Sequence, residues 1–335
     1  MTYLLTPQIL LKARRSFKRK YVIVLDSIHT LKLGPASIVT SYEYRILRLL
    51  EGLGSLPLPC PRPIDFFTIK VLPSGVMERD GDGEGEAGEE WNVIVMSTLP
   101  GRTFGKLSHT MASEERVRVL VEVRGFMEIV NEAMSMLGSK SEGDFRAGHD
   151  TSTISDLDGG RCLKLPLLDG YIYGRIESSS FVSKMEEATP QTLSLCPLQH
   201  SILSTLSPSP SETIQFCHMD LHPGNILLSD GRISGIVDWE LSGLYTPKLD
   251  AFSALMNVIP SRELEADYML AWGVGPDLVQ MANSSTRELA KGVMRRKMEA
   301  RNGGVEGMRL KGWRRRRVVG KGGNKVSDVN DAVIV

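Results

Sequence analysis

Apolar and polar residues alternate in short runs over the first 100 residues, which is typical of a β-rich lobe. The stretch YVIVLDSIHTLKLG predicts two short strands around Asp26-Ser27, and the second strand carries Lys32. In SIVTSYEYRILRLLEGLG the apolar residues recur at helical spacing and the run ends at two glycines, which predicts one helix. Strands are also expected at the end of LPLPCPRPIDFFTI and in WNVIVMSTLPG. These elements predict a small sheet with one helix over residues 1–100 and a linker at residues 97–101.

The segment 73–90, PSGVMERDGDGEGEAGEE, interrupts this pattern between two of the expected strands. It holds seven Asp or Glu, one Arg and few apolar residues. A segment of this composition cannot bury enough apolar surface to order itself. We therefore expect a flexible acidic loop within the small lobe.

Beyond residue 101 the apolar positions recur at helical spacing. In SEERVRVLVEVRGFMEIVNEAMSML, Ser113 is expected to cap a helix whose first turn is acidic. Residues 139–212 are rich in Ser, Gly and Pro and are expected to be irregular, and the helical pattern returns from residue 250 to about residue 300. We therefore expect a larger, mainly helical lobe over residues 101–290. The buried face of its first long helix is predicted to hold Val117, Leu120, Val121, Met127 and Val130.

The composition indicates an ordinary folded protein, with 41% hydrophobic and 24% charged residues in a chain of 335. No apolar run approaches the roughly 18 residues that a membrane span needs. At the amino terminus apolar residues precede basic ones, the reverse of a secretory signal, so we expect an intracellular, cytoplasmic protein without a membrane partner. The four cysteines lie far apart without a C-x-x-C pair, which favours reduced thiols over a zinc site or a disulfide framework.

The net charge of zero conceals a strongly basic end. Residues 291–325 hold 13 Lys or Arg against 2 Glu, so the rest of the chain carries a balancing net negative charge. A basic segment can bind nucleic acid or acidic lipid. This one has neither periodicity nor interleaved aromatic residues, which favours a solvated, disordered tail over residues 291–335 rather than a nucleic-acid partner.

The segment FCHMDLHPGNILL concentrates polar chemistry immediately before an apolar strand. It places His218, Asp220, His222 and Asn225 within eight residues. The chain continues as NILLSDGRISGIVDWE, in which an Asp-Gly turn predicts a hairpin. The hairpin would return Asp238 to the neighbourhood of Asp220 and Asn225.

Three oxygen-bearing side chains brought together in this way suggest phosphate chemistry. Carboxylate and amide oxygens are ligands that Mg²⁺ prefers, together with phosphate and water. In such a site one Asp accepts the proton of an attacking hydroxyl, while an Asn and a second Asp hold the metal ions on the nucleotide.

A different metal site is the main alternative for this motif. His218, Asp220 and His222 alternate and could line one face of a strand, binding Zn²⁺ or Fe²⁺ in a hydrolase. That interpretation does not explain Asn225 or IVDWE. It also lacks further ligands, because the remaining histidines are scattered along the chain, at His29, His109, His149 and His200.

The motif resembles the catalytic segment of the aminoglycoside phosphotransferase and choline kinase branch of the protein-kinase-like superfamily. HMDLHPGN is similar to the His-x-Asp-x-x-x-x-Asn loop of that family, and IVDWE is similar to the segment that replaces Asp-Phe-Gly of protein kinases. The resemblance implies a bilobal, protein-kinase-like α+β fold. It also implies that Asp220 is the catalytic base, that His218 orients the loop, and that Asn225 and Asp238 bind Mg²⁺.

The resemblance extends over residues 21–245. TLKLG is similar to the strand whose lysine, here Lys32, holds the nucleotide phosphates, and Glu43 in the next helix is placed to pair with it. IVMSTLPGRTF resembles the hinge between lobes, where backbone groups from Ser97 to Leu99 would meet adenine. The inserts DLDGGRCLKLPLLDG and YGRIESSSFVSKM are similar to those of the filamentous-fungal members.

Two functions follow from the resemblance. The first is an ATP- and Mg²⁺-dependent phosphotransferase, a monomer that transfers the γ-phosphate to a hydroxyl of a small-molecule acceptor. The second is a kinase-fold binding or scaffold protein with little turnover. Two departures from the family pattern suggest the second function: no glycine precedes Gly34 to form a phosphate loop, and Met219 stands where the family usually has glycine.

Overall fold

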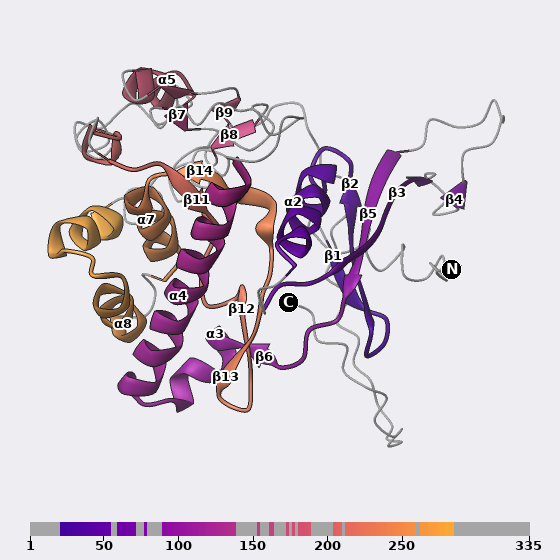
Figure 1. Ribbon diagram of the computed structural model, residues 1–335, viewed down its shortest axis with the longest axis horizontal. Coiled ribbons are helices and arrows are strands. Elements are labelled where there is room, and N and C mark those ends of the chain that lie inside the picture. Colours follow the sequence, from indigo (N-terminus) through magenta and orange to yellow (C-terminus); the bar gives the residue numbers. More distant parts are fainter. Residues whose placement is uncertain are drawn as a thin grey trace, which may run out of the picture.

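The chain folds into a small β-rich lobe and a larger, mainly helical lobe, as the computed structural model in Figure 1 shows. The structure describes residues 21–54, 59–71, 77–78, 89–138, 153–154, 161–163, 172–173, 176–177, 180–188, 204–209, 212–258 and 262–284. The expectations for the basic amino terminus, for the inner part of the acidic loop, for most of 139–212 and for the tail 291–335 lie outside these residues.

The small lobe is a five-stranded antiparallel sheet with α2 (Ser41–Gly52) on one face. Its strand order is β1-β2-β5-β3-β4, which places β2 and β5 at the centre. β5 begins at Glu89, two residues earlier than its apolar run, because Glu89 and Glu90 still pair with β3. The strands are β1 (Tyr21–Val24), β2 (His29–Pro35), β3 (Pro63–Val71), β4 (Met77–Glu78) and β5 (Glu89–Ser97).

Strand alternation decides which face of the sheet Lys32 lies on. Leu31 and Leu33 point to one side, into a small apolar cluster that includes Val93 and Val95. Successive side chains of a strand point to opposite faces. Lys32 therefore points to the other face, the one that α2 covers, and it is only 2% exposed there.

The large lobe is built around α4 (Ser113–Gly138), which packs against α8 (Arg262–Trp272) and β11 (Gln215–Cys217). Two small antiparallel sheets lie beside it: one has the strand order β13-β12-β6, and the other pairs β11 with β14. The other elements of this lobe with described ends are β6 (Arg102–Thr103), α3 (Phe104–Leu107), η1 (Ser108–Thr110), β12 (Ile226–Ser229), β13 (Arg232–Ile236), η3 (Trp239–Leu241), β14 (Gly243–Tyr245) and α7 (Pro247–Val258).

Two details of α4 differ from the sequence prediction. Ser113, expected as the N-cap, is the first helical residue, and its hydroxyl donates to Asp267 Oδ1 on α8 at 2.6 Å. Val121, expected in the core, is 50% exposed, whereas Val119 and Val123 are fully buried. The helix is rotated from the predicted phase, and the buried Arg116–Asp267 ion pair fixes it against α8 in that rotation.

The region between α4 and β11 was expected to be irregular, and its described parts are short. They are β7 (Thr153–Ile154), β8 (Arg161–Leu163), β9 (Ile172–Tyr173), β10 (Ile176–Glu177) and α5 (Phe181–Ala188). Four of the five have only two or three residues.

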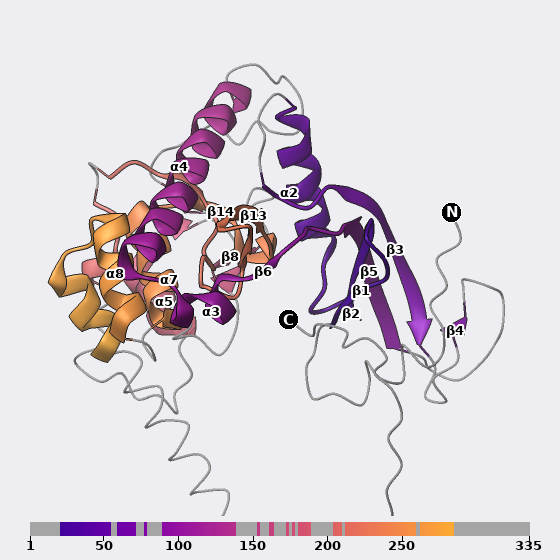
Figure 2. The same ribbon diagram turned by 90° about the horizontal axis from the view of Figure 1, so that it is seen from below.

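The linker after β5 joins the two lobes (Figure 2). Hydrogen bonds hold this linker on both sides. Ser97 N donates to Arg62 O at 2.8 Å, and Ser234 Oγ donates to Pro100 O at 2.5 Å. A second link is made by Ile236 N, which donates to Pro59 O at 2.5 Å. Gly101 has a φ of 107° and lies against the β12 backbone, where any Cβ would come within 2.2 Å of Leu228 O.

The α+β fold with a small β-rich lobe and a helical lobe is confirmed. The Asp230-Gly231 hairpin is also confirmed, because Ser229 pairs with Arg232 and both turn residues have positive φ values of 52° and 72°. Among the described helices, none combines the length and apolar character needed to cross a bilayer.

Candidate active site

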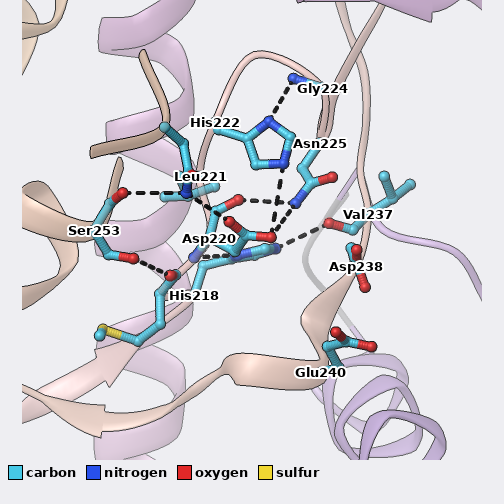
Figure 3. Close-up of polar contacts among 12 residues, drawn as sticks. His218, Asp220, Leu221, His222, Gly224, Asn225, Val237, Asp238, Glu240 and Ser253 are labelled. Atoms are coloured by element: carbon cyan, nitrogen blue, oxygen red, sulfur yellow. Dashed lines mark hydrogen bonds and ion pairs between the residues drawn. The ribbon is translucent and has the colours of Figure 1, made fainter. Parts of the chain in front are cut away.

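His218 follows β11 directly and fixes the start of the loop formed by residues 218–225, here called the Asp220 loop. Its Nδ1 accepts from Asp220 N at 3.2 Å, so its proton is on Nε2, which lies 3.1 Å from Val237 O. Burial lowers the pKa of His218 to about 4, despite the opposing effect of Asp238. A neutral His218 packed 4.5 Å from the Trp239 ring therefore connects the Asp220 loop to the end of β13 (Figure 3).

Met219 adopts the left-handed conformation, with a φ of 64°. This conformation costs a non-glycine residue about 1–2 kcal/mol, which explains why glycine suits the position. Met219 N donates to Asp250 Oδ1 at 2.7 Å, and Ser253 Oγ donates to Met219 O at 2.6 Å. The Met219 side chain is 1% exposed and belongs to the core, so its bulk is directed into the lobe.

Asp250 and Tyr268 complete the support of this backbone. Burial raises the pKa of Asp250 to about 6, partly offset by the hydrogen bond from Met219 N. Tyr268 OH on α8 donates to Leu221 O at 2.7 Å. Side chains from α7 and α8 thus satisfy three backbone groups of the Asp220 loop.

Asn225 holds Asp220 from within the loop (Figure 3). Its Nδ2 donates to the Asp220 backbone oxygen and to Asp220 Oδ2, both at 2.9 Å. An ionised carboxylate only accepts hydrogen bonds, so the amide must present its NH₂ group to it. The Asn225 Oδ1 atom accordingly remains as an oxygen ligand, and Asn225 is 4% exposed.

Two further side chains contact the Asp220 carboxylate. His222 accepts from Gly224 N at 3.0 Å through Nδ1 and places Nε2 3.7 Å from Asp220 Oδ2. Asn257, on α7, donates from Nδ2 to Asp220 Oδ1 at 3.1 Å. Each carboxylate oxygen of Asp220 therefore has an asparagine donor.

The β12–β13 hairpin returns Asp238 to the Asp220 loop as the sequence predicted. Val237 N donates to Asn225 O at 3.0 Å, which ties the end of β13 to the end of the loop. Asp238 follows in the left-handed conformation with a φ of 68°. Strain of this kind in a non-glycine residue persists where the surroundings enforce it, and it is common at functional sites.

Lys32 reaches across from the small lobe to three carboxylates, a group here called the Lys32 cluster. Its Nζ forms a buried ion pair with Glu43 on α2, and it lies 2.6 Å from Asp238 Oδ1 and 3.0 Å from Glu240 Oε2. The predicted proximity of Lys32 to Glu43 and Asp238 is thus present. Tyr42 OH donates to Ser242 O at 2.6 Å, which is a second contact between α2 and the segment that follows β13.

The Lys32 cluster has more negative than positive charge. Burial lowers the pKa of Lys32, but Asp238, Glu43 and Glu240 outweigh it and hold that pKa well above its ordinary value. Burial raises the pKa of Glu43 to about 7, against the lowering effect of Lys32. One lysine therefore faces three carboxyl groups in a largely water-excluded space.

The donor atoms suit a hard divalent cation. Carboxylate oxygens of Glu43, Asp238 and Glu240 lie within 4.8 Å of one another, and the backbone of Asn225 is linked to Val237, the residue before Asp238. Mg²⁺ binds oxygen ligands of this kind and retains waters and phosphate oxygens in its shell. A metal bound here would supply positive charge opposite nucleotide phosphates.

The linker residues predicted to meet adenine are partly engaged within the protein. Ser97 N is bonded to Arg62 O, and Thr98 N donates to Ile28 O at 2.8 Å. Leu99 packs over β13, where a Cβ at Gly235 would come within 2.5 Å of Leu99 Cδ1. Nucleotide contact at Ser97 and Leu99 therefore remains a prediction.

Four of the contacting side chains were missed from the sequence: Glu240, Ser253, Asn257 and Tyr268. Glu240 lies in the quoted IVDWE, where an acidic residue two positions after Asp238 was a visible signal. Asn257 and Ser253 lie 37 and 34 residues after the loop positions that they contact. Helical spacing between Asp250, Ser253 and Asn257 was the one signal that could have placed all three on the same face of α7.

Comparison with known proteins gives one family match. Residues 185–282, which include the Asp220 loop and Asp238, match the protein family described as "Phosphotransferase enzyme family". This match supports the resemblance of the motif to phosphotransferases; the filamentous-fungal type stays a prediction. Comparison with curated proteins gives no match.

Several solved structures of aminoglycoside phosphotransferases are similar to this chain at low sequence identity. The GDP complex of an aminoglycoside 2'-phosphotransferase of type IIIa has 14% identity and a TM-score of 0.49, covering 87% of this chain and 91% of that one. The streptomycin–ATP complex of APH(2'')-IIa has 13% identity and a TM-score of 0.45, covering 89% and 97%. An aminoglycoside-3'-phosphotransferase of type VIII has 15% identity and a TM-score of 0.41, covering 84% and 98%.

Proposed function

We propose that this protein is an ATP-dependent phosphotransferase that moves the γ-phosphate to a hydroxyl of a small molecule. The observation that carries the proposal is the convergence of Lys32, Asp238 and the Asp220–Asn225 pair at the junction of the two lobes. Small-molecule phosphotransfer is also what the family match supports.

Asp220 is the proposed base. It is held by amide donors at both carboxylate oxygens and by its own N–H at His218, so its orientation is fixed before an acceptor arrives. In the reaction the acceptor oxygen bonds to the γ-phosphorus, the bond from that phosphorus to the β-bridging oxygen breaks, and the hydroxyl proton passes to Asp220. His218 is a positioning residue, because it contacts the loop backbone rather than the proposed reacting atoms.

Asn225 and Asp238 are the proposed Mg²⁺ ligands, and Lys32 is the proposed phosphate contact. When bound, Mg²⁺ would neutralise phosphate charge during transfer. Asn225 can offer Oδ1 because both amide hydrogens are donated to Asp220. Glu43 would retain Lys32 in place while Asp238 turns toward the metal, because the Glu43 contact is the more deeply buried of the two.

The test separates binding from turnover. Asp220→Asn keeps the shape of the side chain but cannot take a proton, so we expect kcat to fall about 10²–10⁴-fold with little change in Mg·ATP affinity. Labelled ATP would be offered with a panel of amino alcohols, aminoglycosides and hydroxylated secondary metabolites, and with water alone. Affinity would be measured by calorimetry on the same preparations.

Three outcomes are distinguishable in this experiment. Transfer by the parent and its loss in Asp220→Asn would support the phosphotransferase. Tight Mg·ATP binding without transfer to any acceptor would favour the kinase-fold scaffold. Equal transfer by parent and variant would show that Asp220 is not the base.

A further inference from the structure

We infer that Asn257 is a further functional residue of this site, which fixes one oxygen of Asp220 and offers its own amide oxygen to the acceptor. The inference deepens the proposed function and rests on it. Neither the quoted motif nor its neighbours contain this residue, because Asn257 lies near the end of α7, 37 residues after Asp220.

The two oxygens of the Asp220 carboxylate are held from different elements. Oδ2 accepts from Asn225 Nδ2 at 2.9 Å, within the loop, and faces His222 Nε2 at 3.7 Å. Oδ1 accepts from Asn257 Nδ2 at 3.1 Å. Two amide donors at opposite oxygens restrict rotation of the carboxylate about its terminal bond.

The hydrogen bonds of Asn257 determine where its oxygen lies. Its Nδ2 donates a second bond to Ser253 O at 3.3 Å, one turn back on the same helix. Both amide hydrogens are therefore donated. Because a carboxylate and a carbonyl only accept hydrogen bonds, the NH₂ group of Asn257 must face them and its oxygen must face the other way. Within the described part of the chain, Asn257 Oδ1 accepts no hydrogen bond.

Burial distinguishes the two sides of Asp220. Asn225 is 4% exposed, and Figure 3 shows its amide oxygen on the side away from the Asp220 carboxylate. Asn257 is exposed, although the α7 residues before it, from Leu249 to Met256, are buried. An acceptor arriving from solvent therefore reaches Oδ1 of Asp220 and Oδ1 of Asn257 together.

This arrangement predicts two effects with different kinetic signatures. Donation to Asp220 acts on the base and influences kcat with every acceptor, including water. The Asn257 oxygen, which accepts no hydrogen bond from the described residues, acts on a hydrogen-bond donor of the acceptor near its reacting hydroxyl, and influences the KM for that acceptor. A residue that only stabilised α7 would change neither quantity selectively.

Two substitutions separate these effects. Asn257→Leu removes both the donor and the acceptor atom and keeps the number and branching of the side-chain heavy atoms. Asn257→Asp, tested at pH 8, keeps an oxygen facing the acceptor but replaces the donor by a carboxylate that also repels Asp220; Asn283→Asp, opposite Glu265, introduces the same repulsion outside the site. Asn283→Leu and Asn283→Asp are matched controls, because Asn283 Nδ2 donates to Glu265 Oε2 at 3.2 Å outside the site.

We expect kcat to fall about 10- to 100-fold in both Asn257 variants, the effect of losing a hydrogen bond to a charged group. The acceptor KM should rise about 3- to 10-fold in Asn257→Leu only. The Kd of Mg·ATP should stay within about twofold, and both Asn283 variants should match the parent. Transfer is measured with labelled ATP to the acceptors of the panel and to water, on the full chain.

The inference is overturned if Asn257→Leu retains kcat within about twofold in an active parent background. A rise in Mg·ATP Kd as large as the fall in kcat also overturns it, because such a change indicates general damage. A parent that neither binds Mg·ATP nor transfers phosphate removes the proposed function itself, and this inference with it. An active parent with fully active Asn257 variants removes only the inference.

Discussion

The Asp220 loop and the Lys32 cluster are positioned by different kinds of interactions. In the loop, the hydroxyls of Ser253 and Tyr268 donate to backbone carbonyls, and neutral His218 donates to Val237 O and accepts from Asp220 N, so the geometry follows from directional hydrogen bonds. In the cluster, one lysine is surrounded by three carboxylates, two of which belong to the other lobe.

This difference shows which half of the site is ready before a ligand binds. Directional hydrogen bonds among neutral groups are insensitive to salt and hold one conformation. A buried cluster with excess negative charge is costly, and a bound cation would relieve the excess. The Asp220 loop is therefore preorganised, whereas the carboxylates of the Lys32 cluster would exchange contacts with Lys32 for contacts with a bound cation.

The most disruptive test of this comparison is Lys32→Met, which leaves three carboxylates without their cation. We expect a loss of about 3–5 kcal/mol in the free energy of unfolding, because a buried charge that loses its partner is strongly destabilising. Urea unfolding of the ligand-free protein measures it. The matched control is Lys248→Met, whose single, half-exposed pair with Glu212 should contribute at most about 1 kcal/mol. Equal losses in the two variants would mean that the cluster is not held by charge.

A sharper test concerns the metal side and substitutes Asp238 by Asn. Asn tolerates the left-handed conformation but lacks the charge that holds the ion, so we expect Mg·ATP affinity to fall about 100-fold or more. Asp230→Asn is the control, because Asp230 also has a positive φ and lies in the β12–β13 turn. Calorimetry with and without Mg²⁺ measures the ATP affinity of the parent and of both variants. Unchanged Mg·ATP affinity in Asp238→Asn would remove the metal assignment.

The loop side of the comparison is tested by Ser253→Ala. This change leaves the buried Met219 carbonyl without its donor, and we expect a loss of about 1–3 kcal/mol in the free energy of unfolding. The loss should be the same at low and high salt, because no charge is removed. Ser135→Ala is the control: its hydroxyl donates to Glu132 O on the exposed side of α4, and its loss should be within about 0.5 kcal/mol. A strong salt dependence of the Ser253 effect would erase the distinction between the two regions.

The smallest expected effect is a change in how the free energy of unfolding depends on pH in Glu43→Gln. The folded-state pKa of Glu43 is raised to about 7 from 4.5, chiefly by burial. The stability that this group contributes is therefore fully present below pH 4.5 and lost as the pH rises through 7. Glu43→Gln should flatten this decline by an amount on the order of 1 kcal/mol, seen in unfolding free energies at pH 5 and pH 8. A parent and variant with parallel pH profiles would contradict the raised pKa.

Local patterns were sufficient to predict much of the fold and the site. The apolar runs around Asp26-Ser27 predicted the strand that carries Lys32, and an Asp-Gly pair between apolar runs predicted the hairpin that returns Asp238. Both features depend on residues close together in sequence, so their geometry follows from local stereochemistry.

The predictions failed where distant helices decide the outcome. Val121 was expected to be buried because helical periodicity gives the spacing of a buried stripe but not its rotation, which here depends on the Arg116–Asp267 pair between α4 and α8. Asn257 could not be assigned to Asp220 for the same reason. Its contact depends on how α7 packs beneath the loop, and no pattern within α7 encodes that.

The links around the linker also limit how the lobes can move. The small lobe is attached to the β12–β13 hairpin near Pro100 and, separately, near Pro59. If these two links hold while the contacts of Lys32 and Tyr42 with the large lobe break, the lobes keep one degree of freedom, rotation about the line through the two links. Opening and closing of the lobes would then be a swing about one axis rather than a slide or a twist, and Lys32 would travel along an arc toward and away from Asp238.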